Sequence, residues 1–586
     1  MISRSDKTTS RHGHDVRLGV RRGLRLLCAL GVVSLALGSS CKRTDKRARY
    51  SPRAVAKVLS VDIAALKPAI ASRVERNDRP SWVTPDRWTR VRGLYAAFDN
   101  SPLWLEEGGV KDRATALLDA IRNAPDHGLD TAAYPMSAIQ GVVDAKRLTD
   151  TASAATLGDA DVLLTSAYVA YAADMLIGQV DPKSISQAWH IPAGGQELDT
   201  AIVRGIESPD MKPALDSMAP QNPDYTALKA AYARYRTIAS NGGWQPVTAG
   251  STPAALQARL SAELEGDSST TPGQHAVDST AAPTGVVGKG LEPTASSTGR
   301  PDSRSGSATA AAGAGMRTAL MRYQERHGLD KTGKLDKATL ETINVPAAER
   351  ATQIAANLER HRWLPRALGS RYVFVNVPAF RLDAYDSGQK QLTMKVVVGQ
   401  EYEGKVTPVF SDTMESVVFR PYWNITPDIQ AKEIGPKAAA DGGYLGRNDM
   451  EYYKDGSARR IRQRPGGKNS LGLVKFLFPN QFNIYLHDTP AKELFNKTDR
   501  AASHGCIRIE KPAEMAQWVL GWDAARVQQA MNGGADNTAV RVPKKLPVYI
   551  VYFTAYIRDG QLFFGDDVYN RDASLEQKVV SAATGT

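Results

Sequence analysis

The chain has 586 residues, a length typical of several domains of about 100–200 residues each rather than one. Hydrophobic residues make up 42% and charged residues 23% of the sequence, values that exclude a wholly disordered chain and a membrane protein with many spans. The 74 basic and 62 acidic residues leave a net charge of +12, which by itself would favour nucleic acid or another anionic surface as a partner.

The excess of positive charge is concentrated in the first 50 residues. They contain twelve Lys and Arg residues and three Asp residues, so about +9 of the net charge lies there and about +3 in the remaining chain. Binding to nucleic-acid phosphates requires basic residues clustered on a folded surface. We therefore expect no nucleic-acid partner.

An apolar run, Leu26–Leu37, indicates export. Its 12 residues are fewer than the roughly 20 that span a bilayer, but they suit the hydrophobic region of a signal peptide. The small residues that follow lead into Cys41, as in the lipobox of bacterial lipoproteins, although Gly38 stands where Leu is usual. Cys41 is the expected lipidation site, while simple cleavage before Cys41 would suit the same small residues.

Residues 1–41 are thus predicted to be a signal peptide and lipobox region. The mature protein is expected in the periplasm or cell envelope, with a lipid anchor on Cys41 holding it to a membrane as the favoured interpretation over plain secretion. The Arg21-Arg22 pair also fits twin-arginine export, but an arginine-rich segment produces such pairs by chance.

Residues 52–240 are predicted to form a helical domain, because apolar residues such as Leu117, Leu118 and Ile121 recur at three- and four-residue spacing. The tetrapeptide His-Gly-Leu-Asp occurs at 127–130 and 327–330, and Gly followed by Leu is typical of a helix end. Two such short copies reflect either an internal duplication or, more commonly, the same way of ending a helix.

Residues 241–350 are predicted to form a second helical domain with an insertion at 266–315. Of these 50 residues 37 are Gly, Ala, Ser, Thr or Pro, so the insertion is expected to be disordered because burial cannot offset its ordering entropy. The helical pattern resumes at Met316, and a connecting helix is expected over 351–370, with Pro365 near its end.

After Arg371 the apolar period changes from 3.6 to 2, which predicts a β-rich domain over 371–557. Residues 426–470 are polar and helical in pattern, so we expect them to leave the sheet and form a lid. An amphipathic helix is predicted at 511–522, and a C-terminal hairpin and tail at 558–586. The fold class is therefore multidomain α+β.

Cys506 is the candidate for chemistry. The other two cysteines, Cys28 and Cys41, lie in or beside the export segment, which excludes a disulfide framework and a zinc site built on a cysteine cluster. A lone cysteine is more commonly a small buried hydrophobe. Here the segment 503–508, Ser-His-Gly-Cys-Ile-Arg, is polar, and Gly505 allows a tight turn whose N–H groups could favour a thiolate and hold an oxyanion.

His487 is the candidate base. It ends the segment FNIYLHD, where Phe482, Ile484 and Leu486 alternate with polar positions, so His487 lies on the face opposite the apolar row. Alone it would more commonly be a surface histidine. The 15 residues between His487 and Ser503 suffice for a loop that brings the two segments together. The nine histidines show no metal-motif spacing, and we expect no metal and no cofactor.

The pattern His-x15-Ser-His-Gly-Cys-Ile-Arg resembles the signature of the L,D-transpeptidases with a YkuD-type catalytic domain, bacterial enzymes that remodel peptidoglycan. That signature usually ends in Asn where this chain has Arg508, although Arg is familiar in the large multidomain branch of the family. The resemblance extends over most of residues 90–570 outside the insertion. It is carried further by WLEEGGVKDRATALLDAIRNAPDHGLD, LMRYQERHGLDKTGKLDKATLETIN, NLERHRWLP, RPGGKNSLGLVKFLFPNQFNIYLHDT and LPVYIVYFTAY.

The resemblance implies a helical scaffold, a peptidoglycan-binding-like helical domain and a catalytic domain with a lid. It implies that Cys506 attacks the bond before the terminal D-alanine of a tetrapeptide stem, forms a thioester and releases D-alanine. His487 would move the protons, the backbone carbonyl of Asp488 would orient His487, and the N–H groups of Gly505 and Cys506 would form the oxyanion hole.

Four further residues are expected to bind substrate or stabilise the turn: Ser503, His504, Arg508 and Tyr485. Of these, His504 and Arg508 would orient the turn or contact a carboxylate of the stem. For Arg508, a structural salt bridge is an equal alternative. The implied partner is a peptidoglycan tetrapeptide stem, and the implied product is a 3→3 crosslink. Carbapenems acylate this family, so inhibition by them is expected.

Other outcomes stay open at this point. With water as the acceptor the enzyme would be an L,D-carboxypeptidase or another cysteine hydrolase of peptidoglycan, and with a protein lysine it would tether an envelope protein. A non-catalytic wall-binding lipoprotein is the alternative of a different class. The sequence makes no prediction of oligomeric state.

Overall fold

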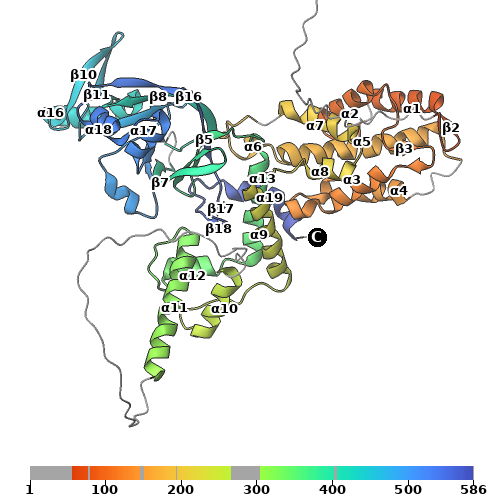
Figure 1. The fold of residues 1–586 in the computed structure, drawn as a ribbon, viewed down its shortest axis with the longest axis horizontal. Helices are drawn as coiled ribbons and strands as arrows, with labels where there is room; N and C mark the ends of the chain where they lie inside the picture. The colour runs from red at the N-terminus through yellow and green to blue at the C-terminus, as the bar shows by residue number, and fades with distance from the viewer. Residues whose placement is uncertain are drawn as a thin grey trace, which may run out of the picture. The chain divides into compact units, whose positions relative to one another are not determined.

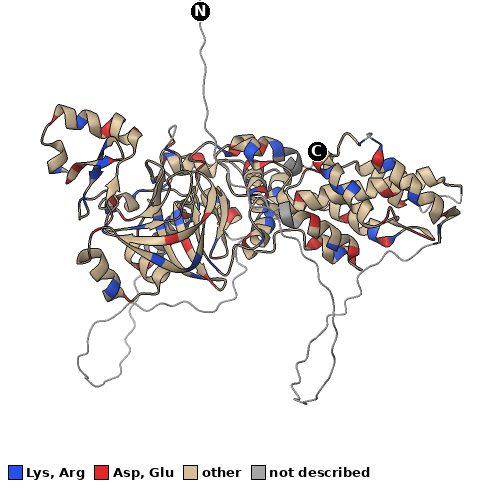
Figure 2. Ribbon diagram, turned by 90° about the horizontal axis from the view of Figure 1, so that it is seen from above, with Lys and Arg blue, Asp and Glu red and all other residues tan. Residues whose placement is uncertain are grey.

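The computed structural model describes residues 56–76, 79–144, 151–192, 195–264, 304–401 and 405–584. The predicted export segment, with Cys28 and the lipidation site Cys41, lies outside the described residues. Within the described ranges, basic and acidic residues are interspersed on the same helices and strands (Figure 2).

The first helical region is built around one long helix, α5 (Ala154–Ile177), which packs against α1, α2, α3, α4 and α7 (Figure 1). Its helices are α1 (Ile63–Glu75), α2 (Pro85–Ala97), α3 (Asp112–Arg122), α4 (Met136–Asp144), α6 (Pro182–Ile185), α7 (Gly195–Glu207), α8 (Met211–Asp216) and α9 (Pro223–Ser240). Two short strand pairs interrupt the helical pattern, β1 (Lys57–Val58) with β2 (Val61–Asp62) and β3 (Leu105–Glu106) with β4 (Gly109–Val110).

Helix α5 is the one helix among the described residues that is long and apolar enough to cross a bilayer. It is also a core helix, since 83% of its most apolar window is buried inside the protein. Its buried Asp161 accepts hydrogen bonds from the N–H groups of Leu103 and Trp104 and from the Tyr95 hydroxyl. These bonds offset part of the desolvation of the carboxyl group, although burial still raises the pKa of Asp161, and they fix the segment that precedes α3.

Both predicted helix ends are found. Gly128 and Gly328 adopt φ 69° and 64°, the left-handed conformation, and the following Leu129 and Leu329 donate their N–H groups back to the carbonyls of Ala124 and Gln324.

The second helical region contains α10 (Pro253–Leu264), α11 (Arg304–Arg326) and α12 (Lys337–Ile343). Its small core includes Leu260, Leu320 and Tyr323. The predicted disordered insertion is wrong at its C-terminal end, because α11 begins at Arg304 and not at Met316. The alanine-rich stretch before Met316 has high helix propensity and extends the packed part of the helix. The rest of the predicted insertion, up to residue 303, lies outside the described residues.

The C-terminal domain is a strand-rich sheet that closes on itself, because β6 pairs with both β5 and β7. Among the described residues the strand order is β14-β7-β15-β13-β12-β8-β16-β5-β6. The strands are β5 (Arg371–Asn376), β6 (Arg381–Asp386), β7 (Gln389–Gly399), β8 (Phe410–Phe419), β12 (Val474–Leu477), β13 (Leu486–His487), β14 (Ala501–Ser503), β15 (Ile507–Ile509) and β16 (Thr538–Val551).

Two helices follow β15, α17 (Pro512–Leu520), which is the predicted amphipathic helix, and α18 (Ala524–Asn532). The predicted strand at FNIYLHD is reduced to Leu486–His487. Asn483 has φ 55°, and the side chain of Asn480 bonds the N–H groups of Phe482 and Ile484, so the preceding residues form a turn and not a strand.

The segment expected to be a helical lid is partly a β-hairpin. It contains α14 (Pro427–Ile429), a π-helical turn (Gln430–Ile434), α15 (Gly435–Ala440), α16 (Tyr444–Arg447), β10 (Met450–Asp455) and β11 (Ala458–Gln463), and β11 pairs with β9 (Trp423–Asn424). Ile425, Ile434, Met450 and Ile461 are buried together, so the lid has a small core of its own. This core explains why a segment that is polar in overall pattern is ordered.

The connecting helix is α13 (Ala347–Arg362), which ends three residues before Pro365. The predicted C-terminal tail is wrong: after the hairpin β17 (Ala555–Arg558) and β18 (Gln561–Phe564), the chain forms α19 (Asp572–Thr584), which packs against α13.

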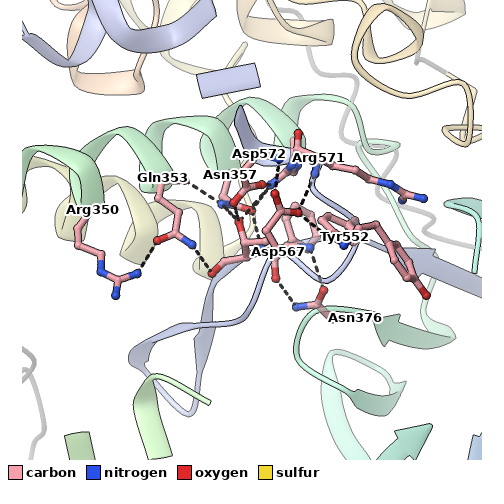
Figure 3. Close-up of polar contacts among 12 residues, drawn as sticks. Arg350, Gln353, Asn357, Asn376, Tyr552, Asp567, Arg571 and Asp572 are labelled. Atoms are coloured by element: carbon pink, nitrogen blue, oxygen red, sulfur yellow. Dashed lines mark hydrogen bonds and ion pairs between the residues drawn. The ribbon is translucent and has the colours of Figure 1, made fainter. Parts of the chain in front are cut away.

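A buried polar cluster joins α13 to this C-terminal segment (Figure 3). Asn357 exchanges two hydrogen bonds with Thr554, at 2.9 and 3.0 Å. The Thr554 hydroxyl donates to Asp572 at 2.6 Å, and Arg360 forms an ion pair with the same carboxylate at 2.6 Å. Buried groups bonded in this way favour one arrangement of the segment, because any alternative would leave charges unpaired.

Candidate active site

Cys506 lies in the turn between β14 and β15. Gly505 has φ 111°, which residues with a side chain rarely adopt, and a Cβ there would lie 3.2 Å from Ile484 Cδ1. The Ser503 hydroxyl spans the turn: it donates to the Cys506 carbonyl at 2.6 Å and accepts from the Gly505 N–H at 3.1 Å. The turn therefore fixes the orientation of Cys506 by its own hydrogen bonds.

Two buried residues, Thr407 and Tyr569, stabilise the turn through a chain of hydrogen bonds that includes the backbone of Gly399. The Thr407 hydroxyl donates to the Gly505 carbonyl at 2.8 Å and accepts from the Gly399 N–H at 2.9 Å. The Tyr569 hydroxyl donates to the Gly399 carbonyl at 2.8 Å and accepts from the Thr407 N–H at 3.2 Å. Tyr569 follows the predicted end of the catalytic domain at residue 557, so the C-terminal segment contributes to this support.

The predicted oxyanion donors differ in availability. The Gly505 N–H is already bonded to Ser503, whereas the Cys506 N–H makes no hydrogen bond within the described residues. Only the Cys506 N–H is therefore free to bind an incoming oxygen.

His487 ends β13 and is buried. Its Nδ1 lies 2.5 Å from the Asp488 carbonyl oxygen. Because a carbonyl only accepts, Nδ1 carries the proton and Nε2 presents a lone pair. Burial, together with the nearby cations of Arg508 and Lys475, lowers the pKa of His487 to about 3. The imidazole is thus neutral at pH 7, in the tautomer that a general base requires.

The expectation that the turn favours a thiolate is wrong. Cys506 is partly exposed at the cavity surface, yet burial by the surrounding walls raises its pKa above the ordinary value. The backbone N–H and hydroxyl of Tyr485 and the cations Arg508 and Lys475 act in the opposite direction but do not prevail. The resting state is therefore a neutral thiol beside a neutral imidazole.

Cys506 and His487 line the same cavity but are not hydrogen-bonded to each other in this structure. The thiol donates instead to the Asn483 carbonyl, at 3.6 Å. Transfer of this proton to His487 Nε2 would require the thiol to give up its bond to the Asn483 carbonyl.

The cavity has a volume of about 600 Å³ and brings most of the predicted residues together. It is lined by Lys405, Tyr422, Trp423, Asn424, Thr426, Asp428, Ile429, Ser470, Leu471, Lys475, Phe482, Asn483, Ile484, Tyr485, His487, Ser503, His504, Cys506 and Arg508. Several of these belong to the lid and the residues that flank it. The lid therefore forms one wall of the space in which Cys506 is reached.

A charged contact ties the lid to the catalytic turn. Glu433 of the π-helical turn lies 2.7 Å from His504 Nε2 and 3.2 Å from Lys405 Nζ. These two partners hold the pKa of Glu433 below its ordinary value. The side chain of His504 is thus directed to the lid and not to the thiol.

Lys475 is one of the cavity residues that were not predicted from the sequence. It lies on β12 directly opposite His487 in the strand register. Its alternation with the buried Val474 and Phe476 could have shown that it shares a face with the site, but only the strand pairing shows which face that is.

The raised thiol pKa leads to a prediction. The rate at which iodoacetamide alkylates Cys506 should rise with pH through an inflection at higher pH in the folded protein than in the same protein denatured in urea, because the thiolate is the nucleophile. Mass spectrometry of the peptide that contains Cys506 separates its rate from those of Cys28 and Cys41. An inflection at lower pH in the folded protein would show that the thiolate is favoured after all.

Comparison with protein families gives three matches. Residues 370–550 match the model described as "L,D-transpeptidase catalytic domain". Residues 89–231 match "Scaffold domain", and residues 298–343 match "Putative peptidoglycan binding domain".

Among curated proteins, the chain is similar to the "Putative L,D-transpeptidase" of Haemophilus influenzae, with 30% identity over 243 residues. The match covers 38% of this chain and 48% of the relative, so the chain spans about half the length of this relative.

Two solved structures are also similar to parts of the chain. One is entitled "Structure of the Ldtfm-avibactam carbamoyl enzyme", with 13% identity, 32% of this chain and 51% of the other covered, and a TM-score of 0.15. The other is an L,D-transpeptidase from Xylanimonas cellulosilytica, with 13% identity, 40% and 78% covered, and a TM-score of 0.15.

Proposed function

Since residues 370–550 match the L,D-transpeptidase catalytic domain, we propose that this chain is a peptidoglycan L,D-transpeptidase that works through a thioester on Cys506. The observation that carries the proposal is the pairing of β13 with β15, by which His487 and the Cys506 turn reach one cavity from neighbouring strands. The Nδ1–H bond to the Asp488 carbonyl leaves Nε2 as a base on that cavity.

Acylation begins from the neutral pair. His487 Nε2 takes the thiol proton as Sγ attacks the carbonyl between the diamino acid and the terminal D-alanine of a tetrapeptide stem. The Cys506 N–H donates to the developing oxyanion. Collapse of the intermediate breaks the C–N bond, and the imidazolium returns the proton to the departing D-alanine amine, which leaves a thioester on Cys506.

A neutral thiol at the start suits this order of reaction steps. Because the pKa of His487 is near 3, the imidazolium is a strong acid that readily protonates the leaving amine. In the second half of the reaction, His487 Nε2 accepts a proton from the side-chain amine of another stem as that amine attacks the thioester. The product is a 3→3 crosslink, and the thiol is restored.

The other domains support a location at the cell wall. We infer that the scaffold and the peptidoglycan-binding match hold the catalytic domain near glycan strands in the periplasm or cell envelope. A lipid on Cys41 would add a membrane anchor, and acylation of Cys506 by a carbapenem is expected as an analogue of the first step.

The test is to incubate the full-length protein with disaccharide-tetrapeptides. Mass spectrometry should find the stem acyl group on Cys506, free D-alanine and 3→3 dimers. If neither the adduct nor the dimers form under conditions where another family member is active, the proposal is wrong. D-alanine release without dimers would make the protein an L,D-carboxypeptidase.

A further inference from the structure

Three functional groups form a row across the floor of the cavity. Lys475 on β12 is paired with His487 on β13, and His487 is paired with Arg508 on β15. Residues that are directly paired on adjacent strands point to the same face of a sheet. The imidazole therefore lies between an ammonium and a guanidinium, and all three line the cavity beside Cys506.

The two cations lack a carboxylate partner in the part of the chain that the structure describes. Within the described residues, neither Lys475 nor Arg508 forms an ion pair with a carboxylate, and Arg508 Nε is buried without a hydrogen-bond acceptor. The Lys475 ammonium lies over the Tyr485 ring, 5.8 Å from its centroid. A structural salt bridge, the alternative considered for Arg508 from the sequence, is absent from this part of the chain.

The carboxylates around the cavity are engaged elsewhere. Asp428 pairs with Lys432, and Glu433 with Lys405 and His504. The side chain of Asp488 bonds Lys492. Glu493, exposed on the turn Lys492–Asn496, acts on Arg508 through space without a hydrogen bond.

Two uncompensated cations in a partly desolvated site are unfavourable by themselves, and burial lowers the pKa of both Lys475 and Arg508. An anion that enters would remove the unfavourable term and accept charge-assisted hydrogen bonds from both groups. The chemistry of the floor therefore suits a carboxylate, which the planar guanidinium recognises with two parallel donors.

We propose that Lys475 and Arg508 form a carboxylate subsite on the cavity floor that binds the C-terminal carboxylate of the donor's terminal D-alanine. This inference rests on the proposed function. The carboxylate fits because it lies one residue from the scissile bond, and both cations line the same cavity as Cys506. The subsite would select stems that end at this residue with a free carboxylate.

The first experiment compares two donors, the tetrapeptide and its C-terminal amide, in the full-length protein. Wild type should prefer the acid, and in Lys475→Met the ratio of kcat/KM for the acid to kcat/KM for the amide should fall by about 10- to 100-fold. Lys475→Arg, which keeps the charge, should keep the preference. Equal losses for acid and amide, or no loss for either, would overturn the subsite.

The second experiment does not depend on turnover. Cys506 is alkylated with iodoacetate, which is anionic, and with iodoacetamide, which is neutral. The ratio of the two rates should fall about tenfold in Lys475→Met and stay unchanged in the matched variant Lys544→Met, whose lysine is exposed on β16. An unchanged ratio in Lys475→Met would overturn the subsite even if the protein is an active transpeptidase.

If the natural donor is not processed but the ratio falls as expected, the proposed function fails while the anion subsite stands. The two proposals are therefore tested separately.

Discussion

Replacing Cys506 with serine is expected to lower the rate of acyl transfer by about 10³-fold or more. The neutral pair explains the size of the effect. His487, with a pKa near 3, is a weak base, and a hydroxyl is a far weaker acid than a thiol, so proton transfer at the start of the reaction becomes much less favourable. The measurement is the initial rate of D-alanine release and of crosslinked dimer formation.

The fold should tolerate this change. Cys506 is partly exposed, and its backbone bonds to Ser503 do not involve the sulfur. The thermal unfolding midpoint of Cys506→Ser should therefore stay within about 1–2 °C of wild type. Retention of more than a tenth of the activity in the folded variant would refute Cys506 as the nucleophile.

Replacing Glu359 with glutamine is expected to destabilise the protein by about 3–5 kcal/mol. Glu359 and Arg362 form an ion pair in which both side chains are fully buried. Arg362 also donates to the His127 carbonyl at 2.8 Å, and Glu359 accepts from the Val180 N–H at 2.7 Å. Through these bonds the pair holds α13 against the first helical region. In Glu359→Gln the charge of Arg362 would stay buried without its counter-charge.

Thermal unfolding followed by circular dichroism should show the transition of the scaffold lowered by about 5–15 °C. The matched control is Glu341→Gln, which breaks an exposed pair with Lys337 at 3.8 Å and should change stability by less than about 0.5 kcal/mol. Similar midpoints for the two variants would mean that burial of the Glu359 pair has no bearing on stability.

Much of the architecture was predictable because its signals are local. The 3.6-residue apolar period, the change to a period of two near Arg371 and the Gly-Leu helix ends each depend on a few neighbouring residues. One error was itself local: the alanine-rich start of α11 is helical because of its helix propensity. The others occurred where packing overrides pattern. The polar lid has a small core, and the C-terminal tail forms α19 because it packs against α13, which lies more than 200 residues earlier in the chain.

The sequence by itself determined which residue types are available for chemistry: one cysteine outside the export segment, in a polar glycine turn, preceded by a histidine. The tertiary structure decided their states and their neighbours. The pKa values of Cys506 and His487 depend on burial by distant segments, which reversed the thiolate prediction. The row Lys475, His487 and Arg508 depends on the register of three strands, a long-range property that no local period specifies.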